Sequence, residues 1–239
     1  PGDGGTSIGA AAYAYNRILG KKRNHAIRNA YLGPEFTDDE IGIFLKENGI
    51  KSSFFKKKED LLDEVAGLIA DGKTVGWFQG RMEWGPRALG GRSILADPGN
   101  PGMKDRINAE IKHREPFRPF APAVCIDDID EYFDCDMPAP MPLDFMAMVY
   151  PIKERWRKKL PAVAHIDGSG RLQAVRREEN EDFYDLIKKF GKISGIPVLL
   201  NTSFNVAGEP IVCTPGDAYN CMRNGGLDAL AMGRYLIKR

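Results

Sequence analysis

The sequence lacks the features that mark several specialised classes of protein. It has four cysteines in 239 residues, and none of them forms the CxxC spacing typical of zinc sites and redox pairs. It has no apolar run near the roughly 18 residues that span a membrane, and no basic segment precedes an apolar one at its start, as in a secretory signal. These absences predict a cytoplasmic protein with reduced thiols and no membrane partner.

The balance of charge argues against a protein that coats nucleic acid. Lysine and arginine number 34, aspartate and glutamate number 33, and the formal net charge is +1. A protein that coats nucleic acid needs a basic excess, so this balance argues against nucleic acid as a partner. The hydrophobic content of 43% is typical of a globular protein. Because the chain starts at Pro1 and not at a methionine, we expect it to be cut from a longer protein.

Helical and strand patterns alternate along the chain. Apolar residues recur at helical spacing over 6–19 and 59–71, and again after Asn180 and Pro215. Thr37 and Glu40 have the spacing of a capping box and predict a short helix through Leu45, and Asn180 predicts a cap for the helix that follows it. The segments between these helices predict strands at 74–78, 121–126, 145–149 and 197–200, a pair of strands near 228–237, and a hairpin that pairs 162–166 with 172–175. The alternation predicts an α/β fold with a twisted mixed sheet and flanking helices.

The lysines at 56–58 lie in an irregular stretch and indicate a linker. A helix and a strand follow directly, as at the start of a new domain. We therefore predict two parts: residues 1–58 as the tail of one domain plus a linker, and residues 59–239 as one complete domain.

Arginine is concentrated in one part of the chain, and three of these arginines lie in the glycine-rich segment 80–93. A guanidinium group offers phosphate several fixed donors and a permanent charge, and glycine lets the backbone approach a ligand. The GxxxxGK[ST] spacing of a Walker loop is absent. The segment predicts a phosphate or nucleotide site; a surface loop whose arginines pair with Glu83 and Glu115 is the alternative. The arginines are Arg81, Arg87, Arg92, Arg106, Arg114 and Arg118.

Three further segments contain candidate site residues. Residues 201–205 follow an expected buried strand, where open α/β sheets bind ligands, although such loops also serve as turns. His165 and Asp167 lie two residues apart in an expected strand, so they would share one face as an acid/base or metal pair. A hydrogen-bonded structural histidine is the alternative. Asp3 precedes a helix and can bind a metal or cap that helix.

Four segments together resemble a known family. They are GRMEWGPRALGGRSILADP (80–98), KHREPFRPFAPAV (112–124), HIDGSGRLQAV (165–175) and NTSFNVAGEPIVCTP (201–215). In this order they resemble the C-terminal domain of the O-carbamoyltransferases that include nodulation protein U and the cephem and tobramycin carbamoyltransferases. The resemblance covers residues 59–237.

This domain is similar to the threonylcarbamoyl-adenylate synthase fold, whose members carry K-x-R after an early helix and S-x-N after a late strand. Lys112 and Arg114 match the first motif, and Ser203 and Asn205 match the second. The resemblance implies that these four residues are catalytic and that the domain forms carbamoyl adenylate from ATP and carbamoyl phosphate with Mg²⁺. It implies that ATP and carbamoyl phosphate also contact Arg81, Arg87, Arg92, Ser93, Arg118, His165, Asp167, Arg171 and Asn201.

The opening segment PGDGGTSIGAA resembles the end of the family's N-terminal ASKHA-type domain. The resemblance implies that Asp3 is a ligand of Fe²⁺ or another divalent metal whose histidine ligands lie upstream. The implied partners are the chain's own N-terminal domain, a hydroxyl-bearing small molecule that accepts the carbamoyl group, and a second copy in a homodimer. Two alternatives stay open: an RNA- or tRNA-binding module, and a threonylcarbamoyl-adenylate-forming enzyme of tRNA modification.

Overall fold

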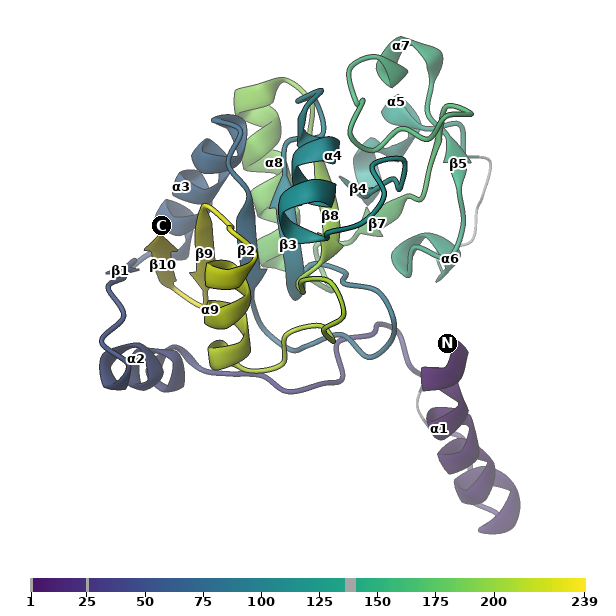
Figure 1. Cartoon of the computed structure of the whole chain (residues 1–239). Helices are drawn as coiled ribbons and strands as arrows, with labels where there is room; N and C mark the ends of the chain where they lie inside the picture. The colour runs from purple at the N-terminus through teal and green to yellow at the C-terminus, as the bar shows by residue number, and fades with distance from the viewer. Residues whose placement is uncertain (1, 25, 136–140) are drawn as a thin grey trace.

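A computed structural model describes residues 2–24, 26–135 and 141–239 (Figure 1). The strands of its main sheet are β1 (Ser53–Phe54), β2 (Val75–Phe78), β3 (Arg92–Ala96), β4 (Ala121–Cys125), β7 (Gln173–Val175), β8 (Val198–Ser203), β9 (Ala229–Met232) and β10 (Tyr235–Lys238). They are ordered β1-β10-β9-β2-β3-β8-β4-β7. The pairs β2–β9 and β4–β7 are parallel, and pairs such as β2–β3 and β3–β8 are antiparallel. The sheet is therefore mixed, which confirms the predicted α/β class.

Helices cover both faces of this sheet (Figure 1). On one face lie α3 (Lys58–Ala70) and α8 (Glu181–Ser194). On the other lie α2 (Asp38–Glu47), α4 (Met103–Arg106), the π-helical turn η2 (Ile107–Ile111) and α9 (Pro215–Asn224). Successive residues of a strand point to opposite faces, so Leu95 packs into the first core, whereas Ile94 packs into the second.

The helix ends follow the local sequence. Thr37 and Glu40 form a complete capping box at the start of α2, and the side chain of Asn180 accepts the N–H of Phe183 at the start of α8. Both caps were predicted by the sequence. Gly195 ends α8 with a left-handed φ of 78°, a conformation that glycine adopts without strain.

A smaller lobe lies beside the β4–β7 edge (Figure 1). It contains the 3-10 turn η3 (Ile126–Asp128), α5 (Ile129–Tyr132), α6 (Met141–Asp144), β5 (Tyr150–Pro151), α7 (Glu154–Arg157) and β6 (Ser169–Gly170). The expected strand over 145–149 is wrong, because most of it forms turns after α6. The expected hairpin is also wrong: β6 pairs with β5, and β7 instead pairs with β4.

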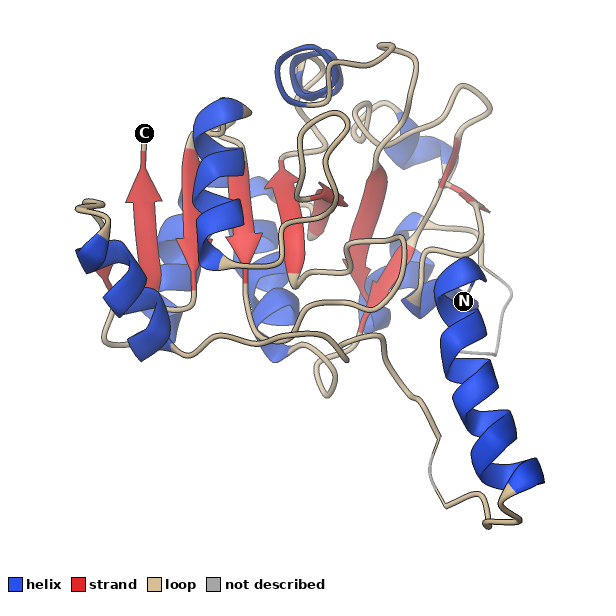
Figure 2. Cartoon of the chain, turned by 60° about the horizontal axis from the view of Figure 1, so that its bottom comes forward, coloured by secondary structure: helices blue, strands red, loops and turns tan. Residues whose placement is uncertain are grey.

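The N-terminal helix projects away from the sheet (Figure 2). It comprises α1 (Gly2–Tyr13) and the π-helical turn η1 (Ala14–Ile18), close to the predicted range of 6–19. Its apolar side chains are exposed, Tyr13 by 63% and Ile18 by 70%. Across the described residues, no helix combines the length and hydropathy needed to cross a membrane.

Candidate functional site

The glycine-rich loop, residues 80–91, connects β2 to β3 and is built around a buried carboxylate. Oε1 of Glu83 accepts the backbone N–H groups of Leu89 at 2.7 Å and Gly91 at 2.6 Å, and that of Arg92 at 3.3 Å. Burial raises the pKa of this carboxyl, whereas the N–H donors act in the opposite direction. The arginine–glutamate ion pair that was the alternative for Glu83 does not form; the carboxylate orders the loop backbone instead.

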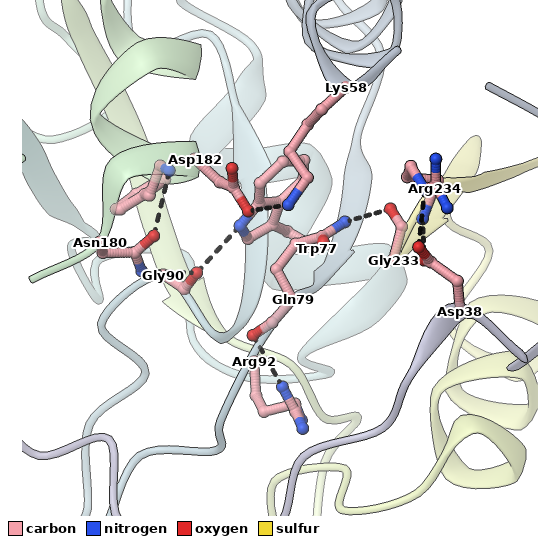
Figure 3. Close-up of polar contacts among 11 residues, drawn as sticks. Asp38, Lys58, Trp77, Gln79, Gly90, Arg92, Asn180, Asp182, Gly233 and Arg234 are labelled. Carbon is pink, nitrogen blue, oxygen red and sulfur yellow. Dashed lines mark hydrogen bonds and ion pairs between the residues drawn. The ribbon is translucent and has the colours of Figure 1, made fainter. Parts of the chain in front are cut away.

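Arg92 is fully buried and structural, which corrects its predicted contact with ATP. Its Nη1 donates to the carbonyl of Gln79 at 3.1 Å (Figure 3). Nη1 also donates to the carbonyls of Gly80 and Gly91 at 3.1 and 3.0 Å, and Nη2 donates to Pro34 O at 3.1 Å. Its guanidinium also lies 3.7 Å from the centroid of the Phe78 ring. Ser93 is also buried, and its hydroxyl accepts the N–H of Gly90. The packing of Arg92 and Ser93 against the chain leaves neither on a ligand-accessible surface.

Residues 30–34, in the linker part of the chain before α2, are hydrogen-bonded to the glycine-rich loop. Gly33 N donates to Met82 O at 2.9 Å, and Met82 N donates to Pro34 O at 2.8 Å. Trp84 N donates to Ala30 O, and the indole N–H of Trp84 donates to Gly4 O of α1 at 3.0 Å. The backbone that presents Arg87 is therefore attached directly to residues 30–34.

Lys112 lies at the end of η2 and is only 6% exposed. Its Nζ is 2.6 Å from Ser203 O, 3.2 Å from Ser203 Oγ, 2.9 Å from Asn205 O and 2.7 Å from Asn205 Oδ1. The structure thus brings together three of the four predicted catalytic residues. Burial, together with the nearby charge of Arg114, lowers the pKa of Lys112 to about 7. The four oxygen acceptors favour the charged form and oppose that shift.

Arg114, the second residue of K-x-R, is half-buried and held on two sides. Its Nε donates to Asn108 Oδ1 at 2.7 Å, and its guanidinium lies 4.9 Å from the centroid of the Phe120 ring. Burial and the charge of Arg118 lower its pKa. Arg118 itself is exposed and pairs with Glu115 at 3.0 Å, so here the surface-pair alternative holds.

Arginines from three separate segments line one small cavity at the end of β8, here called the arginine cavity. Its volume is about 80 Å³. Arg87 comes from the glycine-rich loop, Arg114 from the segment after η2, and Arg171 from the turn before β7. The other lining residues are Pro86, Ala88, Pro119, Phe120, Ala121, Met146, Asn201, Thr202 and Ser203.

The arginine cavity has an excess of positive charge. None of the ion pairs within the described part of the chain includes Arg87, Arg114 or Arg171. Burial and the charges of Arg87 and Arg114 lower the pKa of Arg171. Among the described residues of the cavity, the donor Arg171 Nε is buried without a hydrogen-bond partner. Unpartnered donors and uncompensated cations are the features that an anionic ligand would satisfy.

A larger apolar pocket of about 640 Å³ adjoins the arginine cavity. The two share Pro86, Arg87, Met146 and Arg171 in their walls. The apolar pocket also includes Ile8 of α1, Leu32 of the linker and Trp84 of the glycine-rich loop. The two shared arginines therefore stand where a charged compartment meets an apolar one.

His165 and Asp167 lie in a tight turn and not on a strand. The hydroxyl of Ser169 lies between them, 2.6 Å from Asp167 Oδ1 and 3.1 Å from His165 Nδ1. Burial lowers the pKa of His165, and Asp167 partly offsets this. The structure does not bring this pair into the lining of the arginine cavity. Arg81 is also outside it, exposed and 3.5 Å from Leu32 O.

The residues of the arginine cavity do not fit a metal held by the protein. No carboxylate lines the cavity, and no cluster of three or more His, Cys, Asp or Glu suited to a metal occurs in the described residues. Asp3 belongs to α1, but its side chain is not among the parts of the chain that the structure describes. Its role as a metal ligand stays a prediction.

The sequence places the chain in a family of transferases. The family model described as "Carbamoyltransferase C-terminus" matches residues 66–239. The chain belongs to this family and carries its carbamoyltransferase domain.

Curated relatives match nearly the whole chain. Nodulation protein NolNO of Sinorhizobium fredii is 42% identical over 99% of this chain and 35% of its own length. Nodulation protein NolO of Bradyrhizobium diazoefficiens is 37% identical over 99% of this chain and 43% of its own length. An uncharacterized protein of Synechocystis is 41% identical over 100% of this chain and 42% of its own length. The chain thus spans less than half the length of these relatives.

Solved structures share the fold at low sequence identity. Full-length HypF in a phosphate- and nucleotide-bound form matches with a TM-score of 0.51 and 14% identity. The match covers 79% of this chain and 23% of the HypF chain. Sua5 of P. abyssi complexed with L-threonine has a TM-score of 0.50 and 16% identity, over 74% of this chain and 48% of Sua5. These likenesses support the predicted fold.

Sequence reasoning missed several residues of the site. Phe120 stacks on Arg114, and Met146 lines the arginine cavity. Asn108, which binds Arg114, lies one helical turn before Lys112. The spacing of Asn108 from Lys112 could have indicated this residue, because residues four apart on a helix lie on the same face.

Proposed function

We propose that this chain is the part of an O-carbamoyltransferase in which ATP and carbamoyl phosphate form carbamoyl adenylate. The observation that carries the proposal is the arginine cavity, where three arginines that form no ion pair within the described residues converge beside the strand end that holds Ser203. Membership of the carbamoyltransferase family supplies the chemistry of the transferred group. The acceptor, a hydroxyl-bearing small molecule, and the transfer step belong to the remainder of the longer enzyme.

The reaction needs charge neutralisation more than a covalent nucleophile. For the atoms to balance, water releases phosphate from carbamoyl phosphate, a carbamate oxygen then bonds to the α-phosphorus of ATP, and pyrophosphate leaves. Negative charge builds on the leaving oxygens. Fixed cations stabilise such charge most strongly where water is excluded. Arg87, Arg114 and Arg171 provide these cations, and Mg²⁺ bound to the nucleotide would add to them.

In this proposal Lys112 does not bind phosphate directly. Its donors are occupied by oxygens of Ser203 and Asn205, so it fixes the end of β8. Ser203 lines the arginine cavity and has its carbonyl and hydroxyl bound to this ammonium. Lys112 thereby places positive charge beside the hydroxyl of a residue that lines the arginine cavity.

The first experiment measures ATP affinity and carbamoyl-phosphate-dependent release of pyrophosphate. Loss of a charge-assisted contact costs roughly 1.5–3 kcal/mol, so Arg114→Ala and Arg171→Ala should each weaken ATP binding about tenfold to a hundredfold. Arg155→Ala is the control, because Arg155 is an exposed arginine paired with Glu131 in the smaller lobe. Unchanged ATP affinity in both cavity variants would refute the proposal.

The same assay separates the alternatives. Pyrophosphate release that requires L-threonine and bicarbonate in place of carbamoyl phosphate would indicate an enzyme of tRNA modification. Binding of tRNA at low salt, without ATP-dependent chemistry, would indicate an RNA-binding module.

A further inference from the structure

Asn108 is a buried amide that the proposed chemistry does not yet use. It lies in the π-helical turn η2 and is 1% exposed. The turn is closed by the N–H of Lys112, which donates to Ile107 O at 2.9 Å. Such widened turns are uncommon and occur often at functional sites. Asn108 and Lys112 lie four residues apart, so the same turn positions both.

The side chain of Asn108 has all of its amide hydrogens engaged. Nδ2 donates to Pro116 O at 3.3 Å and to Arg118 O at 3.0 Å. Oδ1 accepts from Arg114 Nε at 2.7 Å, and the backbone carbonyl of Asn108 accepts from Arg114 N at 3.1 Å. One buried amide thus binds the guanidinium of Arg114 and both flanks of the exposed residue Phe117.

These bonds fix the plane and the free edge of the Arg114 guanidinium. A guanidinium has five N–H donors, and Asn108 takes only the one on Nε. The Phe120 ring covers one face, 4.9 Å away. The outer edge of the guanidinium, formed by Nη1 and Nη2, is engaged by neither contact. These two nitrogens can donate in parallel to one anion.

We propose that Asn108 is a positioning residue that orients Arg114 in the arginine cavity so that its outer edge meets the anionic ligand. This inference rests on the proposed function, because it assigns Arg114 to an anion such as the pyrophosphate group of ATP. An amide suits the task better than a carboxylate. Aspartate at position 108 would neutralise Arg114 and would leave the carbonyls of Pro116 and Arg118 without donors.

The test is a double-mutant cycle with inorganic pyrophosphate as the probe. Asn108→Ala, Arg114→Ala and the double variant are compared by calorimetric binding and by thermal unfolding. If Asn108 acts through Arg114, Asn108→Ala weakens pyrophosphate binding at least tenfold in the wild-type background and less than twofold in the Arg114→Ala background. Asn224→Ala, at an exposed position at the end of α9, is the control and should leave binding unchanged.

The Asn108→Ser variant keeps a hydrogen-bonding hydroxyl at this position, adds no charge and covers the case in which Asn108→Ala does not fold. It should also weaken binding only when Arg114 is present. Equal losses with and without Arg114 would show a general structural role and would overturn the inference, as would unchanged binding in both Asn108 variants. Failure of the proposed function has a different signature: the unmodified chain would bind neither pyrophosphate nor ATP.

Discussion

Lys112 shows how a single buried residue can serve a site without facing the ligand. Its ammonium is surrounded by four oxygens of Ser203 and Asn205, and it is close to the uncompensated charge of Arg114. Burial and like charge oppose protonation, whereas the acceptors favour it. The balance between them is measurable because protonation changes stability.

Lys112 should make the free energy of unfolding depend on pH. With a pKa lowered from 10.5 to about 7 in the fold, the lysine binds more protons when unfolded at any pH between those values. Stability should therefore rise with pH across this window, by up to about 1.4 kcal/mol per pH unit, and Lys112 should add no pH dependence below about pH 7, where both states carry the proton. Urea unfolding from pH 7 to pH 9, expressed as the difference from Lys112→Met, measures this contribution.

The Lys158→Met variant, at an exposed lysine, is the control for the general effect of removing one positive charge. A difference for Lys112→Met no steeper than that of this control would mean that the four acceptors hold the pKa of Lys112 near 10.5.

At the scale of elements, the glycine-rich loop is ordered by its own carboxylate. Glu83 gathers three backbone N–H groups, and Trp77 Nε1 donates to Gly90 O at 2.9 Å from the neighbouring strand (Figure 3). The loop carries Arg87 into the arginine cavity. Its shape is therefore set before any ligand binds.

Glu83→Ala should destabilise the fold by about 3 kcal/mol or more, because it leaves buried N–H groups without an acceptor. Glu83→Gln keeps one acceptor oxygen and should cost less. The midpoint of urea unfolding measures both, with the exposed Glu115→Ala as the control. Equal stability of Glu83→Ala and Glu115→Ala would contradict the assigned role of this carboxylate.

The sequence predicted regular elements better than the irregular ones. The capping residues of α2 and α8 and the buried runs of β2 and β8 are local signals, so these elements were predicted correctly. The alternation at 145–149 and 162–166 misled, since turn geometry and pairing between distant strands decide those segments. Among the site residues, Lys112, Ser203 and Asn205 were brought together as expected. The buried position of Arg92 was not predicted, because a glycine-rich sequence does not reveal whether an arginine side chain points to solvent or hydrogen-bonds the backbone.

At the scale of the whole molecule, the segment before α3 is part of the folded body. β1 pairs with β10, Asp38 pairs with Arg234 at 2.6 Å, and Ile41 and Leu45 are buried in the core. The linker also holds the glycine-rich loop through Gly33 and Pro34. The predicted boundary near residue 59 can be tested against these contacts.

Two shortened chains should differ in stability. A chain of residues 29–239 keeps these contacts and should unfold within about 1 kcal/mol of the full chain, as expected when few contacts are removed. A chain of residues 59–239 loses Ile41 and Leu45 from the core and should lose about 4 kcal/mol or more. Urea unfolding of both decides the point; equal stability would place the boundary at 59.

The position of Trp84 gives the protein a built-in optical signal. The chain has three tryptophans; Trp77 is fully buried, whereas Trp84 is 47% exposed, belongs to the loop that carries Arg87 and donates its indole N–H to Gly4 O of α1. Its emission will follow the polarity of the apolar pocket and the bond to Gly4. Occupation of the arginine cavity, or a movement of α1, can therefore be followed by intrinsic fluorescence in unlabelled protein.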